Sequence, residues 1–125
     1  MRLVTRDTSS GTYEVWEEKV MKGDKVTPKA QIMASNGAIV QAVATNQSAV
    51  GYIGIGYLNE SLKGLSVENI EANVETARTG EYPISRYLFM FTRGWPTGET
   101  MRFINFVLSD EGQKIVTDTG FVPIR

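Results

Sequence analysis

The chain has 125 residues, a formal net charge of −1, and neither histidine nor cysteine. Its length suits one domain, and the missing His and Cys exclude common zinc sites as well as Cys/His and Ser-His-Asp catalysis. Acidic and basic residues are interspersed, so no basic face indicates nucleic acid. We therefore expect a single domain that needs no metal and no cofactor.

The chain begins abruptly, because Met1 and Arg2 run straight into a short apolar strand, Leu3 to Thr5. No signal peptide is expected there, and no run approaches the roughly 20 apolar residues of a membrane span. Such a start fits a cytoplasmic protein or a mature or truncated form of a longer one. The abruptness favours truncation.

The stretch from Arg6 to Thr12, Arg-Asp-Thr-Ser-Ser-Gly-Thr, is the most informative feature of the chain. It joins the first strand to a predicted helix over 13–21, which Ser10 or Thr12 caps. A helix start has about four unpaired N–H groups and a partial positive charge of roughly one half. With two hydroxyls and one guanidinium beside it, this start predicts a small oxyanion receptor. The alternative is that Ser-Gly-Thr is a simple helix cap.

The remaining elements alternate between helical and extended patterns. We predict a loop over 24–34, a helix over 38–45, a strand over 49–55, a short helix or turn over 56–63, a small strand over 65–67, up to two helical turns within 70–79, a strand over 85–92 buried on both faces, and helices over 98–108 and from 109 to near 120. This alternation predicts an α/β domain with a mixed or parallel sheet between helices. In such sheets ligands lie at the carboxyl ends of strands, which is where Arg6 to Thr12 falls.

Several segments resemble, in order, the phosphate-binding proteins of bacterial and archaeal phosphate ABC transporters. Arg-Asp-x-x-Ser-Gly-Thr is similar to the phosphate loop of that family. The other landmarks are Ser-Asn-Gly-Ala-Ile-Val at 35–40, Ala-Val-Gly-Tyr-Ile-Gly at 49–54, Tyr-Pro-Ile-Ser-Arg at 82–86 and Phe-Val-Leu-Ser-Asp-Glu-Gly-Gln at 106–113. Together these ordered matches are much more specific than any one of them.

The resemblance implies one lobe of a type II periplasmic-binding-protein fold, in which a ligand is clamped between two lobes. Residues 1–125 correspond to the second lobe, with its core at about 1–80 and the hinge return and C-terminal helices at 81–125. By this resemblance most of the first lobe would precede Met1, and it is absent from these 125 residues. In the family that lobe supplies the other half of the phosphate contacts, including a carboxylate that accepts a hydrogen from protonated phosphate.

The resemblance also implies the site residues. Arg6 matches the arginine that binds phosphate oxygens, Ser10 and Thr12 match donors, and Gly11 matches the position where the backbone comes close to the ligand. Asp7, Ser9 and Asn36 are further candidates. Some members have an acid two positions after the arginine, where this chain has Thr8, and its acid is Asp7 instead.

By this resemblance the chain binds inorganic phosphate as part of the receptor of an ABC importer, outside the cytoplasm, with a membrane permease as partner and without catalytic activity. Two alternatives stay open. One is another oxyanion, such as sulfate, molybdate or phosphonate. The other is a self-associating module, a homodimer formed through the surface that the missing lobe exposes, with the 82–92 segment as a candidate contact. Arg86 is interpreted either as a hinge salt-bridge residue or as a generic surface charge.

Overall fold

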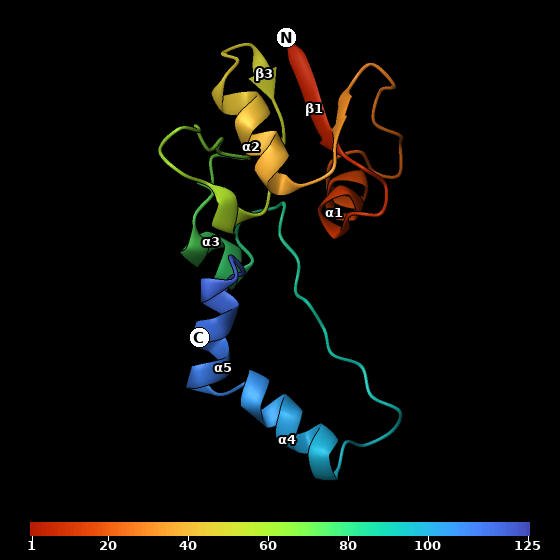
Figure 1. Ribbon diagram of the computed structural model, residues 1–125, viewed down its shortest axis with the longest axis vertical. Coiled ribbons are helices and arrows are strands. Elements are labelled where there is room, and N and C mark those ends of the chain that lie inside the picture. Colours follow the sequence, from red (N-terminus) through yellow and green to blue (C-terminus); the bar gives the residue numbers. More distant parts are fainter.

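A computed structural model describes residues 1–125 and places three short parallel strands at one end of the molecule (Figure 1). The strands are β1 (Arg2–Arg6), β2 (Gln31–Met33) and β3 (Ala49–Val50), in the order β2-β1-β3. β1 is the central strand: Thr5 is aligned with Ile32 of β2, and Leu3 is aligned with Val50 of β3. Parallel strands end at the same edge of a sheet. Arg6, the last residue of β1, therefore lies at the edge towards which β2 and β3 also run.

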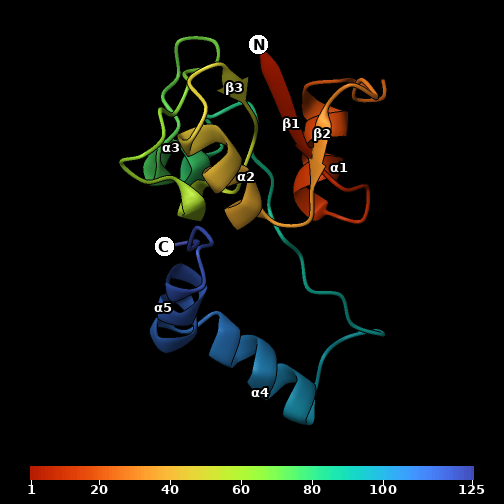
Figure 2. The same cartoon turned by 45° about the horizontal axis from the view of Figure 1, so that its top comes forward.

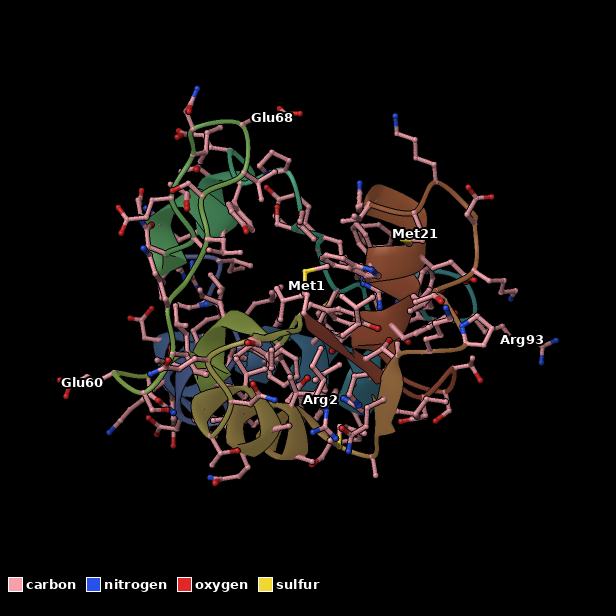
Figure 3. All side chains as sticks on the ribbon, turned by 90° about the horizontal axis from the view of Figure 1, so that it is seen from above. Met1, Arg2, Met21, Glu60, Glu68 and Arg93 are labelled. Atoms are coloured by element: carbon pink, nitrogen blue, oxygen red, sulfur yellow. The ribbon has the colours of Figure 1, made fainter.

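Helices follow the strands in chain order. They are α1 (Gly11–Lys19), α2 (Asn36–Ala44), the 3-10 turn η1 (Ile55–Tyr57), α3 (Val74–Thr79), α4 (Gly98–Val107) and α5 (Asp110–Asp118). Two views place β1 between α1 on one side and α2 on the other (Figure 2). Seen from above, Met1 and Arg2 lie near the centre of this layer, whereas Glu60, Glu68 and Arg93 lie at the periphery (Figure 3). No helix combines the length and the apolar character that crossing a bilayer requires.

The core lies where α2 meets β1. Its buried apolar side chains are Val4, Tyr13, Ala30, Ile39 and Val40. The closest approach is at Gly51, where an added Cβ would lie 2.9 Å from Ile39 Cγ2 and 3.3 Å from the Val4 carbonyl oxygen. Space therefore favours glycine there, because a Cβ would force Ile39 to shift and would press on the Val4 carbonyl.

The predicted fold class is confirmed: the chain is α/β, with a parallel sheet flanked by helices. The first strand and the helix after Ser10 lie where they were expected. The segment 24–34 is not entirely a loop, because β2 occupies 31–33 and pairs with β1. A three-residue strand has too little pattern to be recognised, and its pairing partner supplies most of its definition. The strand predicted over 49–55 is paired only at Ala49 and Val50.

The prediction of a buried strand over 85–92 is wrong for this chain. The segment is unpaired and its apolar side chains are exposed, including Phe89 at 72% and Phe91 at 91%. Its run of β-forming apolar residues has the composition of a doubly covered strand, but no strand of this chain pairs with it. Figure 1 shows the segment running from the sheet end of the molecule down to α4 as an extended connection.

The C-terminal helices α4 and α5 lie at the opposite end of the molecule, where a short turn joins them at an angle (Figure 1). Gly112, in the first turn of α5, lies so close to the Phe106 carbonyl that a Cβ would meet it at 2.1 Å. The end of α5 returns towards the sheet end, because Gly120 lies against Gly56 of η1. Exposed apolar side chains remain on both helices: Phe103 and Phe106 on α4, and Ile115 on α5.

Candidate functional site

Arg6 is the last residue of β1, and its side chain is only 14% exposed. Its guanidinium donates to Asn36 Oδ1 at 3.4 Å, to the Ala34 carbonyl at 3.2 Å and to Asp7 Oδ2 at 3.5 Å. The Nε–H group is buried and has no hydrogen-bond partner in the protein. A buried charged donor without an acceptor is costly, so this group indicates a place for an external acceptor.

Asp7 and Ser9 form the turn that follows. The Asp7 Oδ1 atom accepts from the Ser9 N–H at 3.1 Å and from the Ser9 hydroxyl. These hydrogen bonds, with a smaller contribution from the Arg6 charge, lower the pKa of Asp7 below its ordinary value. Asp7 is thus an ionised acceptor that is already engaged by its own neighbours. It orders the turn between β1 and α1.

Ser10 caps α1 with its side chain. Its Oγ accepts from the Thr12 N–H at 3.2 Å and from the Tyr13 N–H at 3.4 Å, and the residue is buried. The Gly11 N–H finds no acceptor in the chain, and neither the Ser10 nor the Thr12 hydroxyl donates to a protein group. The start of α1 therefore presents three donors, one from each residue of Ser10-Gly11-Thr12, that protein atoms leave free.

A second helix start lies beside Arg6. Ser35 caps α2 by accepting from the Ala38 N–H at 3.1 Å, and the Gly37 N–H is left free. Asn36, the first residue of α2, turns its amide oxygen to the Arg6 guanidinium. Because that oxygen is the acceptor for Arg6, the Asn36 side-chain NH₂ remains available as a donor.

Tyr52 holds the end of β1 through hydrogen bonds of its hydroxyl group. Its Oη lies 2.6 Å from Thr5 Oγ1 and accepts from the Arg6 N–H at 3.3 Å. Thr5 is buried, so this contact satisfies a hydroxyl that water cannot reach. The backbone of Arg6 is thereby held from the side of β3, while its guanidinium is held from the side of α2.

A cavity of about 220 Å³ opens at the carboxyl end of β1. Arg6, Asp7, Thr8 and Tyr13 line it on one side, and the loop 25–30 closes the other. Ser10, Gly11 and Thr12 do not line this cavity. A larger hollow of about 490 Å³ lies on α5 and the C-terminal residues, away from every residue predicted for the site.

The structure thus brings some predicted site residues together and separates others. Arg6, Asp7 and Asn36 are in hydrogen-bond contact. The Arg6 side chain makes no hydrogen bond to Ser10, Gly11 or Thr12. Their neighbour is instead Arg86, which donates to the Gly11 carbonyl at 3.4 Å.

Sequence reasoning left the role of Arg86 open and did not identify Tyr52 as a support of the site. Neither role has a local signal. Arg86 lies 75 residues from Gly11 in the chain, and Tyr52 lies 46 residues from Arg6. No group of three or more acidic residues is placed to hold a metal ion.

Hydrogen-bond donors gather at the end of a parallel strand and beside two helix starts. The chain belongs to the family described as the PBP superfamily domain, whose model matches residues 1–111. It is 30% identical, over 99% of its length, to the phosphate-binding protein PstS of Pseudomonas aeruginosa. It is 32% identical, over 98% of its length, to PstS of Bacillus subtilis.

Solved structures agree with this assignment. The phosphate-binding protein of a Streptococcus pneumoniae phosphate ABC transporter matches all of the chain with a TM-score of 0.82 and 27% identity. A putative phosphate ABC transporter substrate-binding protein from Clostridium perfringens, with bound phosphate, matches all of it with a TM-score of 0.78 and 30% identity. The chain spans 42% and 41% of the two curated relatives and 52% of each solved chain. It is thus similar to about half of a larger receptor.

Proposed function

We propose that this chain binds inorganic phosphate through Arg6, Ser10, Gly11 and Thr12, with Asp7, Ser9 and Asn36 supporting them. The observation that carries the proposal is the surplus of donors at the end of β1. The buried Arg6 Nε–H and the Gly11 N–H have no acceptor in the chain, and the Ser10 and Thr12 hydroxyls donate to none. A tetrahedral oxyanion supplies many acceptors in a small volume, so it is the ligand that this donor set matches.

The proposed binding needs the Arg6 guanidinium to turn towards the start of α1, because its present partners are Asn36, Asp7 and Ala34. The Arg6 guanidinium contacts two neutral acceptors, Asn36 and the Ala34 carbonyl, at 3.2–3.4 Å, and it also contacts the Asp7 carboxylate at 3.5 Å. Hydrogen bonds to a charged partner are stronger than those to neutral groups. Phosphate would therefore compete well with the Asn36 and Ala34 acceptors for the guanidinium, and the start of α1 lies directly after the Arg6–Ser9 turn.

At the level of the whole receptor, we infer that the chain serves a phosphate ABC importer, outside the cytoplasm, with a membrane permease as partner. The relatives carry the names of phosphate-binding proteins, not of enzymes, and we infer no catalytic activity for this chain. Residues 1–125 would form one lobe of the receptor, with its core at about 1–80 and the return and C-terminal helices at 81–125. The other lobe would contribute the remaining phosphate contacts.

The test is a phosphate titration of the full chain at fixed ionic strength, followed by NMR of the Gly11 and Thr12 amides. Each charged hydrogen bond contributes about 1.5–3 kcal/mol, and association has its own cost, so this half of a site should bind at about 1 mM. Arg6→Lys, which loses the forked geometry, should weaken binding about tenfold. Arg93→Lys is the matched control, because Arg93 lies at the periphery (Figure 3).

Submicromolar binding by a verified monomer would contradict the idea of half a site. Amide shifts that sulfate produces as strongly as phosphate would favour the other proposed ligand class, a different oxyanion such as sulfate, molybdate or phosphonate. No shift of Gly11 or Thr12 at about 10 mM phosphate, roughly ten times the expected dissociation constant, would overturn the proposal.

A second candidate role is self-association, which the exposed apolar side chains at 87–91 favour. Phe89, Phe91 and Trp95 are each more than 70% exposed, and Phe103 of α4 is 63% exposed. Apolar surface of this extent in a soluble chain commonly marks an interface. We propose that two copies associate through this surface when nothing else covers it. Light scattering tests this proposal, and a monomer at high protein concentration would refute it.

A further inference from the structure

The segment 82–86 connects two parts of the molecule that are far apart in the sequence. At one end, the Tyr82 N–H donates to the Thr76 carbonyl at 3.0 Å and the Tyr82 hydroxyl donates to the Leu65 carbonyl at 3.2 Å. At the other end, Arg86 reaches the first turn of α1. The segment is therefore anchored on the α3 side by Tyr82 and on the α1 side by Arg86.

Arg86 makes two contacts with α1. Its Nη1 lies 3.1 Å from Glu14 Oε2, and its Nη2 donates to the Gly11 carbonyl at 3.4 Å. A Cβ on Gly11 would lie 3.0 Å from Nη2, so the guanidinium lies directly against the glycine that opens the helix. The Arg86 side chain is 32% exposed, whereas the Arg102–Glu99 pair on α4 is 79% and 86% exposed.

A cation in this place is not explained by helix stability. The positive end of the helix dipole is at the N-terminus, where a positive side chain is unfavourable by several tenths of a kcal/mol to about 1 kcal/mol. Glu14 offsets part of this cost, but it is itself 67% exposed. The arrangement is more favourable when an anion occupies the helix start, because Arg86 then faces two negative groups instead of one.

We propose that Arg86 is a positioning residue for anion binding: it neutralises Glu14 beside the α1 start and couples occupancy of that start to the segment 82–86. The inference rests on the proposed phosphate binding and extends it to a residue outside the Arg6–Thr12 loop. With Glu14 neutralised, an incoming phosphate meets no free carboxylate at the first turn of α1. With phosphate bound, the Arg86 contacts strengthen and the segment that leaves this part of the molecule is held more tightly.

The experiment titrates inorganic phosphate into the wild-type chain, Arg86→Ala, Arg86→Lys, Glu14→Gln and the Glu14→Gln/Arg86→Ala double variant, following the Gly11 and Thr12 amides. Arg86→Ala should weaken binding about two- to fivefold, as expected for one partly exposed charge. Arg86→Lys should restore part of the loss. In the double variant the loss should be smaller than in Arg86→Ala, because the uncompensated Glu14 carboxylate is also gone. Arg102→Ala, from the exposed pair on α4, should bind as the wild type does.

A second measurement separates coupling from a merely structural ion pair. Hydrogen exchange at 84–86 should slow on adding phosphate to the wild type and should not respond in Arg86→Ala. Equal phosphate affinities for the wild type and Arg86→Ala, or an unchanged exchange response, would overturn the inference while leaving phosphate binding intact. If phosphate did not shift the Gly11 and Thr12 amide signals of the wild type, the proposed function would be overturned, and this inference with it.

Discussion

The ring of Trp16 stacks on that of Tyr52, with their centroids 4.6 Å apart and their planes inclined by 6°. Trp16 belongs to α1 and Tyr52 follows β3, so the stack joins the helix that opens at Gly11 to the far side of the sheet. The same tyrosine holds the end of β1 through Thr5 and the Arg6 N–H. The Tyr52 side chain thus contacts both β1 and α1, the two elements that the Arg6–Ser9 turn connects.

Tyr52→Phe should keep the stack and lose the hydroxyl. We expect the free energy of unfolding to fall by about 1–2 kcal/mol, because the buried Thr5 hydroxyl loses its short contact with Tyr52. Chemical denaturation followed by Trp fluorescence measures this loss. Tyr57→Phe removes a hydroxyl from an exposed ring that makes no hydrogen bond, and it should cost little. Equal costs for the two variants would show that the Thr5 contact contributes nothing.

Ser10→Ala and Ser35→Ala remove equivalent caps from α1 and α2. Each should lower the free energy of unfolding by about 1 kcal/mol, the usual contribution of an N-cap hydroxyl. Only Ser10→Ala should also weaken phosphate binding, since Ser10 supplies a proposed ligand donor. Thermal melting and phosphate titration of both variants check this, and a similar loss of affinity in Ser35→Ala would remove the distinction between the helix starts.

Asp7 should make stability depend on pH in the acid range. Its pKa is lowered in the folded state, so its contribution is present above the ordinary value of about 3.9 and is lost as pH falls through the folded pKa. Asp7→Asn should therefore be less stable than the wild type at neutral pH, and the difference should shrink below about pH 4. Denaturation of both proteins between neutral and acid pH measures the trend. Asp24→Asn, which removes a carboxylate that makes no hydrogen bond, corrects for the change in net charge.

Gly51→Ala should test the tight approach of the chain after β3 to the core. The new Cβ would meet Ile39, which is 1% exposed, at 2.9 Å, so we expect a loss of about 1–3 kcal/mol from overpacking. Gly37→Ala is the matched control. The nearest atom to its new Cβ is Ser35 Oγ at 3.9 Å, and alanine is the better helix former. If Gly51→Ala were as stable as Gly37→Ala, the backbone near Gly51 would have more room than its surroundings indicate.

The junction of β1 and α1 could be read from the sequence because its determinants are local. Leu3 and Val4 define a buried strand, and Ser10 followed by Gly-Thr marks a helix start whose cap contacts span only two and three residues. Ser35 marks the second helix start in the same way. The junction itself was therefore predicted, and the anion site placed on it is a proposal.

Other features depended on partners that local patterns do not reveal. β2 is defined by its pairing with β1 and not by its three residues. The apolar run at 87–91 has a strand's composition but lacks a neighbour in this chain, so it stays exposed.

Sequence alone determined the α/β class, the two capped helix starts and the donor-rich turn at Arg6, because each follows from short-range propensity and capping chemistry. Tertiary structure alone decided where the charges lie. It turned the Arg6 guanidinium to Asn36, placed Arg86 against Gly11 and Glu14, and set Tyr52 under the end of β1. Those contacts join residues 30 to 75 positions apart, and only the folded chain brings such groups within hydrogen-bond distance.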